Sequence, residues 1–334
     1  MSGVASGGGE DPVGGGAPGG AVSGGGSAAY GGGGAPGRRV SGPVTDGVVV
    51  VDKPAGWTSH DAVARCRRIF GQKRVGHAGT LDPDATGVLV VGLGRATRLL
   101  RYVTDLPKSY EGEVVLGVAT STLDAAGEET GRWDMTGVTL DDVRAAAAGF
   151  VGEIDQVPPM VSAVKIGGRR LHALARAGVE VERPPRRVTV HRFDVDPTAE
   201  AGVYRVSVDC SSGTYIRSLA ADVGTALGGG AHLRALRRTA IGPFTLAVAV
   251  PLDDVGPEAV LPPAAAVAQH PSATVGPDVA AVVATGKVLA AGELGVDGEG
   301  PWAVLDTGGA LLAVYERHPD GRVKPAVVLA TPDA

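Results

Sequence analysis

A turn-rich stretch from Gly76 to Gly87 holds the densest group of residues in this chain that could carry out chemistry. It combines an imidazole at His77, several hydroxyls, and a carboxylate at Asp82 that is followed directly by a proline. Glycines allow a backbone to approach a ligand closely or to adopt positive φ. A following proline restricts Asp82 to an extended or turn conformation, which directs its side chain. The stretch therefore indicates a loop that contacts a ligand; the alternative is a surface turn in which Asp82 bonds its own backbone.

Two other segments place polar side chains at the ends of predicted strands. Residues 211–217 end in Arg217 at a strand-to-helix junction, where a guanidinium can form a two-pronged bond with a carboxylate and keep it ionised. The alternative is a simple ion pair with a nearby acid such as Asp222. Residues 108–110 lead into another strand and form the third candidate segment, in which Tyr110 could serve the chemistry. The alternative is that Tyr110 is an ordinary half-buried strand residue.

Nothing in the sequence indicates a metal ion or an organic cofactor. His77 has no second ligand at short or helical spacing, and the other histidines are scattered singly. No Gly-Lys-Ser/Thr triplet closes a phosphate-binding loop. Cys66 and Cys210 are the only cysteines and lie far apart, which excludes a disulfide scaffold or a cysteine zinc site and suits a reducing cytoplasm. We therefore expect no cofactor, no metal and a cytoplasmic protein.

The elements that must position these groups follow from hydrophobic periodicity. A β-branched run over 47–51 predicts a buried strand that ends at a proline. Residues 58–61 carry N-cap signals, and apolar residues at helical spacing then predict a helix over about 60–70. Residues 139–142 have the spacing of a capping box, which predicts a second helix start. Further strands are expected over 88–93, 110–118 and 204–208, and further helices over 171–177 and 216–227.

The chain divides into three regions by composition. Residues 1–45 contain about a third of the 53 glycines and no apolar run, so we expect a disordered, glycine-rich extension. Over 46–255, strands and helices mix without regular alternation, which favours an α+β fold over a doubly wound sheet. Short apolar segments between Gly and Pro turns predict a small β-rich domain over 256–334. Beyond residue 45, the longest charge-free stretch, 259–277, contains prolines and polar residues, so no membrane span is expected.

Positive charge is clustered although the net charge of the chain is −5. A cluster of this kind is ordinarily a solvated surface. If several clusters border one site, they form a groove that follows a phosphate backbone. The three clusters are Arg65, Arg67, Arg68, Lys73 and Arg74; then Arg183, Arg186, Arg187 and Arg192; and lastly Arg234, Arg237 and Arg238.

Successive segments between about 47 and 245 closely resemble, in order, the motifs of bacterial tRNA pseudouridine-55 synthases. The resemblance implies an α+β pseudouridine-synthase-like catalytic domain with a mixed, mostly antiparallel sheet, and a small C-terminal β-rich, PUA-like domain. It also implies tRNA as the partner, bound through its T-arm. Nothing in the sequence demands an oligomer, so we expect a monomer. The segments are 51–61, 76–87, 108–110, 159–165, 213–217 and 230–239.

The resemblance also implies a reaction and roles for individual residues. The family converts an N1–C1′ glycosidic bond of one T-arm uridine to a C5–C1′ bond after base flipping. Asp82 matches the catalytic aspartate, Tyr110 the tyrosine that stacks on the base and assists proton removal from C5, and Arg217 the arginine paired with the aspartate. The remaining matches are Tyr215 and Leu236 in the uridine pocket, His77 at the extruded nucleotide, and Lys53 with Pro54 in a motif that supports the site wall.

Two residues depart from the family pattern, and two other functions compete with this one. His172 stands where a tyrosine is expected, and Gly229 stands where a cysteine is frequent. One competing function is a non-catalytic RNA-binding or tRNA-folding protein that uses the same groove. The other is a carboxylate-based glycoside or nucleoside hydrolase, which would need a second acid, and Asp84 is the nearby choice.

Overall fold

The structure is a computed structural model that describes residues 44–162, 165–166, 169–170 and 181–331. The expected disordered extension over 1–45 therefore lies almost entirely outside the described residues. The helix expected over 171–177, together with His172, also lies outside them.

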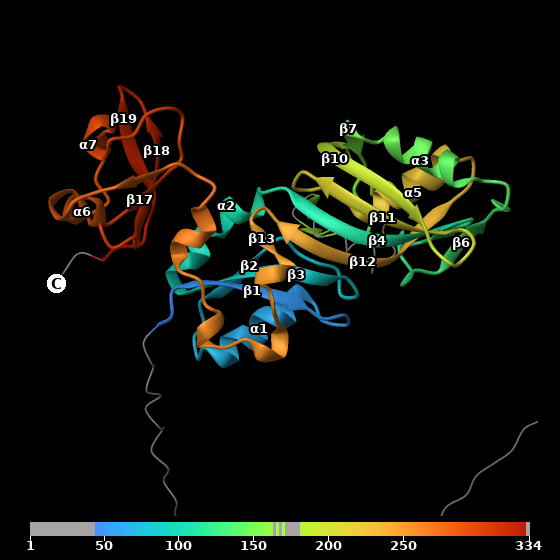
Figure 1. Cartoon of the computed structure of the whole chain (residues 1–334), viewed down its shortest axis with the longest axis horizontal. Helices are drawn as coiled ribbons and strands as arrows, with labels where there is room; N and C mark the ends of the chain where they lie inside the picture. The colour runs from blue at the N-terminus through green and yellow to red at the C-terminus, as the bar shows by residue number, and fades with distance from the viewer. Residues whose placement is uncertain (1–43, 163–164, 167–168, 171–180, 332–334) are drawn as a thin grey trace, which may run out of the picture. The chain divides into compact units, whose positions relative to one another are not determined.

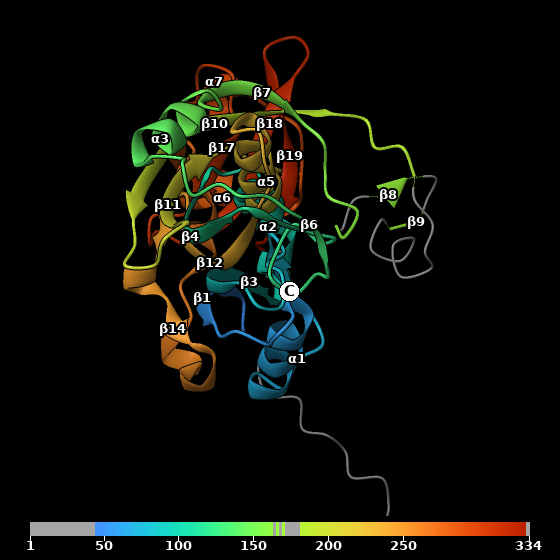
Figure 2. The ribbon, with the colours of Figure 1, turned by 90° about the vertical axis from the view of Figure 1, so that its right-hand side faces the viewer.

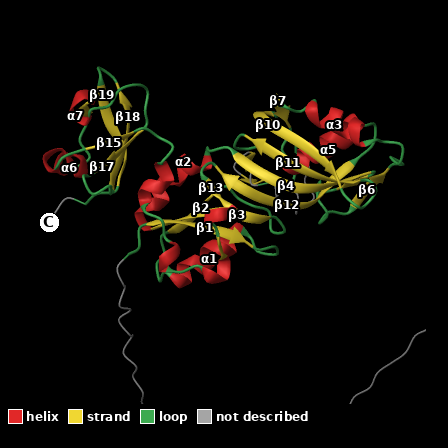
Figure 3. Ribbon diagram, viewed as in Figure 1, coloured by secondary structure: helices red, strands yellow, loops and turns green. Residues whose placement is uncertain are grey.

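Ten strands of the described chain form one large sheet that runs through the body of the fold (Figures 1 and 3). Its neighbours are antiparallel except at two places, where β1 pairs with β14 and β3 pairs with β12 in parallel. The fold is thus α+β with a mixed, mostly antiparallel sheet, as predicted. In spatial order the strands are β14 (Val250–Pro251), β1 (Gly47–Lys53), β3 (Thr86–Leu93), β12 (Ala231–Ile241), β4 (Lys108–Leu116), β11 (Val203–Cys210), β10 (Arg186–Pro197) and β7 (Gly152–Gln156), with β2 (Val75–Ala78) beside β3 and β13 (Phe244–Thr245) beside β12.

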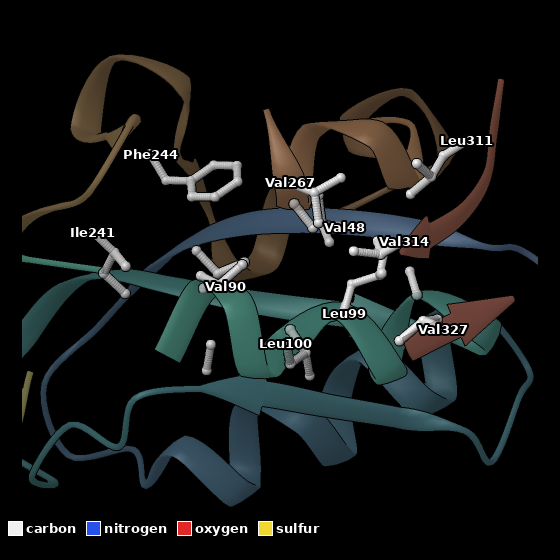
Figure 4. Close-up of a cluster of buried hydrophobic side chains, with 14 of the residues drawn as sticks. Val48, Val90, Leu99, Leu100, Ile241, Phe244, Val267, Leu311, Val314 and Val327 are labelled. Atoms are coloured by element: carbon white, nitrogen blue, oxygen red, sulfur yellow. The ribbon is translucent and has the colours of Figure 1, made fainter. Parts of the chain in front are cut away.

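The valine run of β1 is buried on both faces of the sheet. Val48 points into one core with Leu99 of the 3₁₀ helix η1 (Gly94–Leu99) and Leu100 of α2 (Leu100–Thr104), as Figure 4 shows. Val50 belongs to the same core. Val49 and Val51 point into a second core against the helix α1 (Ser59–Ile69). A strand covered on both sides needs apolar residues at every position, which explains the unbroken run.

Two helices begin at the capping signals read from the sequence, and both starts are capping boxes. The Thr58 hydroxyl of α1 accepts the Asp61 N–H, and the Asp61 carboxylate accepts the Thr58 N–H. Thr139 and Asp142 make the same reciprocal contacts at the start of α3 (Leu140–Ala148). These contacts satisfy amides that the first helical turn leaves without partners, so local sequence determines both helix starts.

The other half of the sheet carries α3 and α5 (Ile216–Ala226) on one face (Figures 1 and 2). Leu219, Ala220 and Val223 of α5 pack with inward-facing residues of β4, β10, β11 and β12. Two short two-stranded sheets accompany this half, β5 (Val118–Thr120) with β6 (Glu129–Arg132) and β8 (Lys165–Ile166) with β9 (Arg169–Arg170). The strand expected over 110–118 therefore lies two residues earlier, because β4 begins at Lys108, ends at Leu116, and the chain turns at Gly117 into β5.

A separate five-stranded sheet follows toward the C-terminus and has its own hydrophobic core. No helix in the described part of the chain is long and apolar enough to cross a membrane. The sheet contains β15 (Ser272–Thr274), β17 (Trp302–Leu305), β18 (Leu311–His318), β19 (Arg322–Val328) and β16 (Leu289–Ala290). The same region includes the helices α6 (Pro277–Ala284) and α7 (Ala291–Leu294). The preceding segment holds the 3₁₀ helices η2 (Leu246–Val248), η3 (Leu252–Asp254), η4 (Pro257–Ala259) and η5 (Pro263–Val267).

We expect Gly87→Ala to lower the free energy of unfolding by roughly 2–4 kcal/mol. Gly87 has a φ of +99°, and a Cβ there would lie 2.2 Å from the carbonyl oxygen of Arg238 on β12. Gly56→Ala is the matched control, because Gly56 has a φ of +77° and open space around it. That control isolates the conformational cost of about 1–2 kcal/mol. Urea unfolding measures both; equal losses would show that the backbone contact between β3 and β12 does not matter.

Candidate active site

A two-pronged ion pair between Arg217 and Asp82 lies at the centre of the site. The Nε of Arg217 is 3.0 Å from Oδ2 of Asp82, and its Nη2 donates to Oδ1 at 3.2 Å. Arg217 belongs to the first turn of α5, and Asp82 to the loop between β2 and β3. The Arg217 side chain is 4% exposed, whereas that of Asp82 is 43% exposed. The guanidinium thus holds the carboxylate from the protein side and leaves its other side open.

Three more contacts determine the orientation of Arg217. Its Nη1 lies 3.3 Å from Oδ2 of Asp124 and donates to the carbonyl of Thr122 at 2.9 Å. Its Nη2 also donates to the carbonyl of Val161 at 2.8 Å. The partners of Arg217 are therefore Asp82 and Asp124 rather than Asp222. Sequence reasoning missed Asp124, which lies in the β5–β6 connection outside every motif.

The surroundings of Asp82 change its acidity in two opposing ways. Burial against the loop raises the pKa of its carboxyl above the ordinary value, and the positive charge of Arg217 lowers it. The neighbouring charge of Asp124 adds to the increase, and burial is the largest cause. Because fewer water molecules screen this carboxylate, its attraction to positive charge developing nearby is stronger than in bulk water.

A cavity of about 250 Å³ opens beside the ion pair. Tyr110 of β4 and Leu236 of β12 contribute side chains to its walls, and Tyr215 lies at the N-cap of α5. Together with Asp82 and Arg217, five residues singled out from the sequence thus line one cavity. The structure places there the carboxyl group of Asp82, two aromatic residues and an aliphatic wall, which suits a planar polar ring as ligand. The same cavity is also lined by Lys108 and Arg238, to which sequence analysis assigned no individual role.

Lys53 does not line this cavity but lies beneath the loop that carries Asp82. Its side chain is fully buried, and its Nζ donates to the carbonyls of Pro54 at 2.9 Å, Trp57 at 2.7 Å and Pro83 at 2.8 Å. Burial lowers the pKa of this amine to about 8, against the opposing charges of Asp84 and Asp82. Lys53 therefore joins β1 to the backbone directly after Asp82.

His77 also lies outside the cavity, on β2. Its ring contacts that of His60 edge-on, with centroids 5.5 Å apart. Burial lowers the pKa of His77 to about 4, and the neighbouring His60 contributes to the decrease. His77 is therefore a neutral imidazole near neutral pH. Across the described ranges, no group of three or more His, Cys, Asp or Glu side chains could hold a metal ion.

The glycine at position 229, one of the two departures from the family pattern, has a steric explanation. A Cβ at Gly229 would lie 2.5 Å from Sδ of Met135, and one at Gly230 would lie 2.4 Å from the ring of Trp133. The segment after β6 therefore packs directly on this glycine backbone. A cysteine at position 229 would require the flexible Met135 side chain to move.

The three basic clusters differ in how far acids neutralise them. Arg67, Arg68, Lys73 and Arg74 have no carboxylate within 4.0 Å among the described residues. In the second and third clusters several arginines form ion pairs: Arg187 with Glu153 and Asp155, Arg192 with Asp194 and Asp209, Arg234 with Glu113 and Glu200, and Arg237 with Asp52. The free positive charge thus concentrates around the end of α1 and the start of β2.

Solved structures share this fold. A chain in a crystal structure of a Cbf5-Nop10-Gar1 complex is similar with a TM-score of 0.67 at 28% identity, covering 86% of both chains. A chain in the structure of an H/ACA RNP bound to a substrate RNA containing 2′-deoxyuridine is similar with a TM-score of 0.65 at 26% identity, again over 86% of both. In sequence, residues 67–216 match the N-terminal domain of TruB family pseudouridylate synthases. The fold is thus that of a pseudouridylate synthase.

Residues 217–262 match the C-terminal domain of tRNA pseudouridylate synthase B. The chain belongs to the TruB family, which confirms the resemblance seen in its motifs. The tRNA pseudouridine synthase B of Mycobacterium sp. (strain KMS) is 48% identical over 292 residues, which cover 86% of this chain and 97% of that protein. That of Thermobifida fusca (strain YX) is 47% identical over 297 residues, or 86% of this chain and 99% of the relative.

We expect Arg217→Met to raise the pKa of Asp82 by about 1–3 units. The substitution removes the opposite charge that stabilises the carboxylate at 3.0 Å, while burial remains. The ¹³C chemical shift of the Asp82 carboxyl, followed by NMR across a pH titration, measures the midpoint. Arg237→Met serves as the control, because it removes an arginine paired with Asp52 instead. An unchanged midpoint in Arg217→Met would contradict the electrostatic role given to Arg217.

Proposed function

We propose that this chain converts uridine-55 in the T-arm of tRNA to pseudouridine, with Asp82 acting on the everted nucleotide. The observation that carries this proposal is the half-exposed Asp82 carboxylate, which Arg217 holds at the wall of a cavity lined by Tyr110. The TruB family membership and the tRNA-modifying relatives support the same reaction.

Each chemical step has a residue suited to it. Breaking the N1–C1′ bond needs a nucleophile or a stabiliser of positive charge at C1′, and the Asp82 carboxylate can supply either. The detached base must rotate while it is held, for which Tyr110 offers an aromatic platform and Leu236 an apolar wall. Loss of the C5 proton completes the exchange, and Tyr110 is the residue proposed to assist it. The reaction is redox-neutral, so we propose that it uses no cofactor or metal.

The RNA contacts follow from charge and access. Everting a uridine costs a few kcal/mol of stacking, which stacking on protein aromatic groups and phosphate contacts offset. Arg67, Arg68, Lys73 and Arg74, for which the described residues provide no carboxylate partner, lie on the last turn of α1 and directly before β2, which carries His77. We therefore propose that this surface contacts the T-arm backbone near the everted nucleotide. We further propose that Tyr215 lines the uridine pocket and that Lys53 supports the site wall.

The remaining proposals concern organisation. We propose that residues 46–255 form the catalytic domain and 256–334 a PUA-like domain, and that the enzyme acts as a cytoplasmic monomer. The C-terminal region carries nine acids and four bases, so most phosphate contacts are assigned to the catalytic domain.

Asp82→Asn is expected to reduce isomerisation by at least about 1,000-fold, because the amide cannot act as a nucleophile or carry negative charge. Tritium release from T-arm transcripts labelled at uridine C5 measures the reaction. Asp84→Asn is the matched control, since it makes the same change two residues away on an exposed side chain; it should retain activity within about threefold. Label retention by the wild-type protein at high concentration would refute the function, and release of free uracil would favour the hydrolase.

As the pH is lowered, activity should begin to fall at a higher pH than it would if Asp82 had the ordinary aspartate pKa. The ionised form of Asp82 is the active one, so kcat/KM rises as pH increases through its pKa. Because burial raises that pKa, the acid midpoint should lie above about 3.9, the ordinary aspartate value. Tritium-release rates across pH give the midpoint, and circular dichroism checks that the protein stays folded. A midpoint at or below the ordinary value contradicts this expectation.

A further inference from the structure

Arg238 is a buried cation at the inner wall of the cavity that holds Asp82. It lies directly opposite Tyr110 in the antiparallel pairing of β12 with β4, and the residue is 1% exposed. Its Nε donates to the carbonyl of Val88 at 2.8 Å, and its Nη2 donates to the carbonyl of Gly79 at 2.9 Å. The guanidinium is therefore held in one orientation between β3, the loop before Asp82 and the Tyr110 ring.

No negative charge in the described part of the chain neutralises this guanidinium at close range. Within 4.0 Å of it there is no carboxylate oxygen, whereas Arg217 in the same cavity has two carboxylate partners. Lys108, two residues before Tyr110 on β4, shares this property: it is 6% exposed, and its Nζ donates to the carbonyls of Thr104 and Leu106. The inner part of the cavity thus carries two buried positive charges that no ion pair cancels.

Such an arrangement is unfavourable in the empty protein. A buried ion without a counter-ion loses hydration that carbonyl dipoles only partly replace. The two cations also oppose each other, since burial lowers the pKa of Lys108 to about 8 and the charge of Arg238 contributes to the decrease. The fold even leaves space for the guanidinium, because a Cβ at Gly79 would lie 3.3 Å from Nη1 of Arg238. A region of uncancelled positive potential of this kind favours a ligand that carries or develops negative charge.

We propose that Arg238 and Lys108 stabilise the negative charge that the uracil ring acquires when its glycosidic bond breaks. This inference rests on the proposed isomerisation. When N1–C1′ breaks, the bonding electron pair stays with the base and spreads over N1, O2 and O4. After rotation, an electron pair of the ring forms the C5–C1′ bond. The C5 proton then leaves and one proton binds N1, so the overall composition is unchanged. The cations act while the ring is detached and negative.

The lining of the cavity favours a detached base over a phosphate group as the source of that charge. Tyr110, Tyr215 and Leu236 surround the space with aromatic and apolar surface, which suits a planar ring. Nε and one N–H of Nη2 of Arg238 already donate to carbonyls, which occupies the Nε–Nη2 edge that would otherwise form a two-pronged bond with a phosphate. Its contribution is a nearby positive charge, and such preorganised charge is most effective in a site shielded from water.

The test compares two T-arm transcripts that differ only at the target, which is uridine in one and 5-fluorouridine in the other. Fluorine withdraws electron density and stabilises the detached base anion, so it reduces the need for help from the protein. Single-turnover loss of the target nucleoside, measured in nuclease digests, gives the rate for both. We expect Arg238→Gln to slow conversion of the uridine transcript by about 100-fold and conversion of the fluorinated transcript by only about tenfold. Arg238→Lys, which keeps the charge, should fall between Arg238→Gln and wild type.

Controls separate charge from structure. Val90→Ala removes a buried core side chain without changing charge, so it should slow both transcripts by the same factor. Lys108→Gln should repeat the fluorine-dependent pattern, and it replaces Arg238→Gln if thermal unfolding shows that the latter does not fold.

Equal slowing of the two transcripts by Arg238→Gln and Lys108→Gln would overturn the inference. Weaker transcript binding at an unchanged single-turnover rate would also overturn it, and would instead assign the cations to a phosphate. If the wild-type protein converts neither transcript, the proposed function itself fails. If the wild-type protein converts the transcripts but the variants slow both of them equally, only this inference fails and the proposed function stands.

Discussion

The contact between Arg217 and Asp82 is the constraint on which the site depends. It joins residues 135 positions apart in the chain, and it forms only when the first turn of α5 meets the loop between β2 and β3. The guanidinium is buried, so its direction is set by protein contacts to Thr122, Asp124 and Val161. The carboxylate is left half-exposed. Because the buried guanidinium contacts the Asp82 carboxylate from one side only, it fixes the position of the carboxylate and leaves the other side accessible to a substrate.

Buried positive charge recurs around this pair and is held mainly by backbone carbonyls. Lys53 fastens the carbonyl of Pro83, directly after Asp82, and Arg238 fastens that of Gly79 on the other side of the same loop. Both residues belong to strands of the large sheet, so their hydrogen bonds anchor the loop to the sheet. The close approach of β3 to β12 at Gly87 also helps to position the loop, because a side chain at Gly87 would force the two strands apart. Preorganisation of this kind lowers the reorganisation that the reaction requires.

Sequence reasoning succeeded wherever the deciding interactions are local or the pattern is long. The boxes at Thr58 and Thr139 satisfy amides only three residues away, so both helix starts could be read directly. The valine run of β1 showed a strand buried on both faces, and ordered motifs identified the family. It failed where a charge meets a distant partner that lies outside the motifs. Asp124 lies in no motif, and Arg238 looked like one member of a surface cluster until β12 placed it inside the protein.

The amino-acid sequence therefore specified the elements, the family and the residue types that the chemistry requires, because periodicity, capping and motif order are encoded along the chain. Only the folded molecule showed that Asp124 joins Asp82 as a partner of Arg217, and which arginines are buried. Those outcomes depend on through-space distance and on dielectric environment, and both are set by how β3, β4, β12 and α5 converge. Residue types name the charges that are present, whereas packing decides whether each one is solvated, paired or left to act on a ligand.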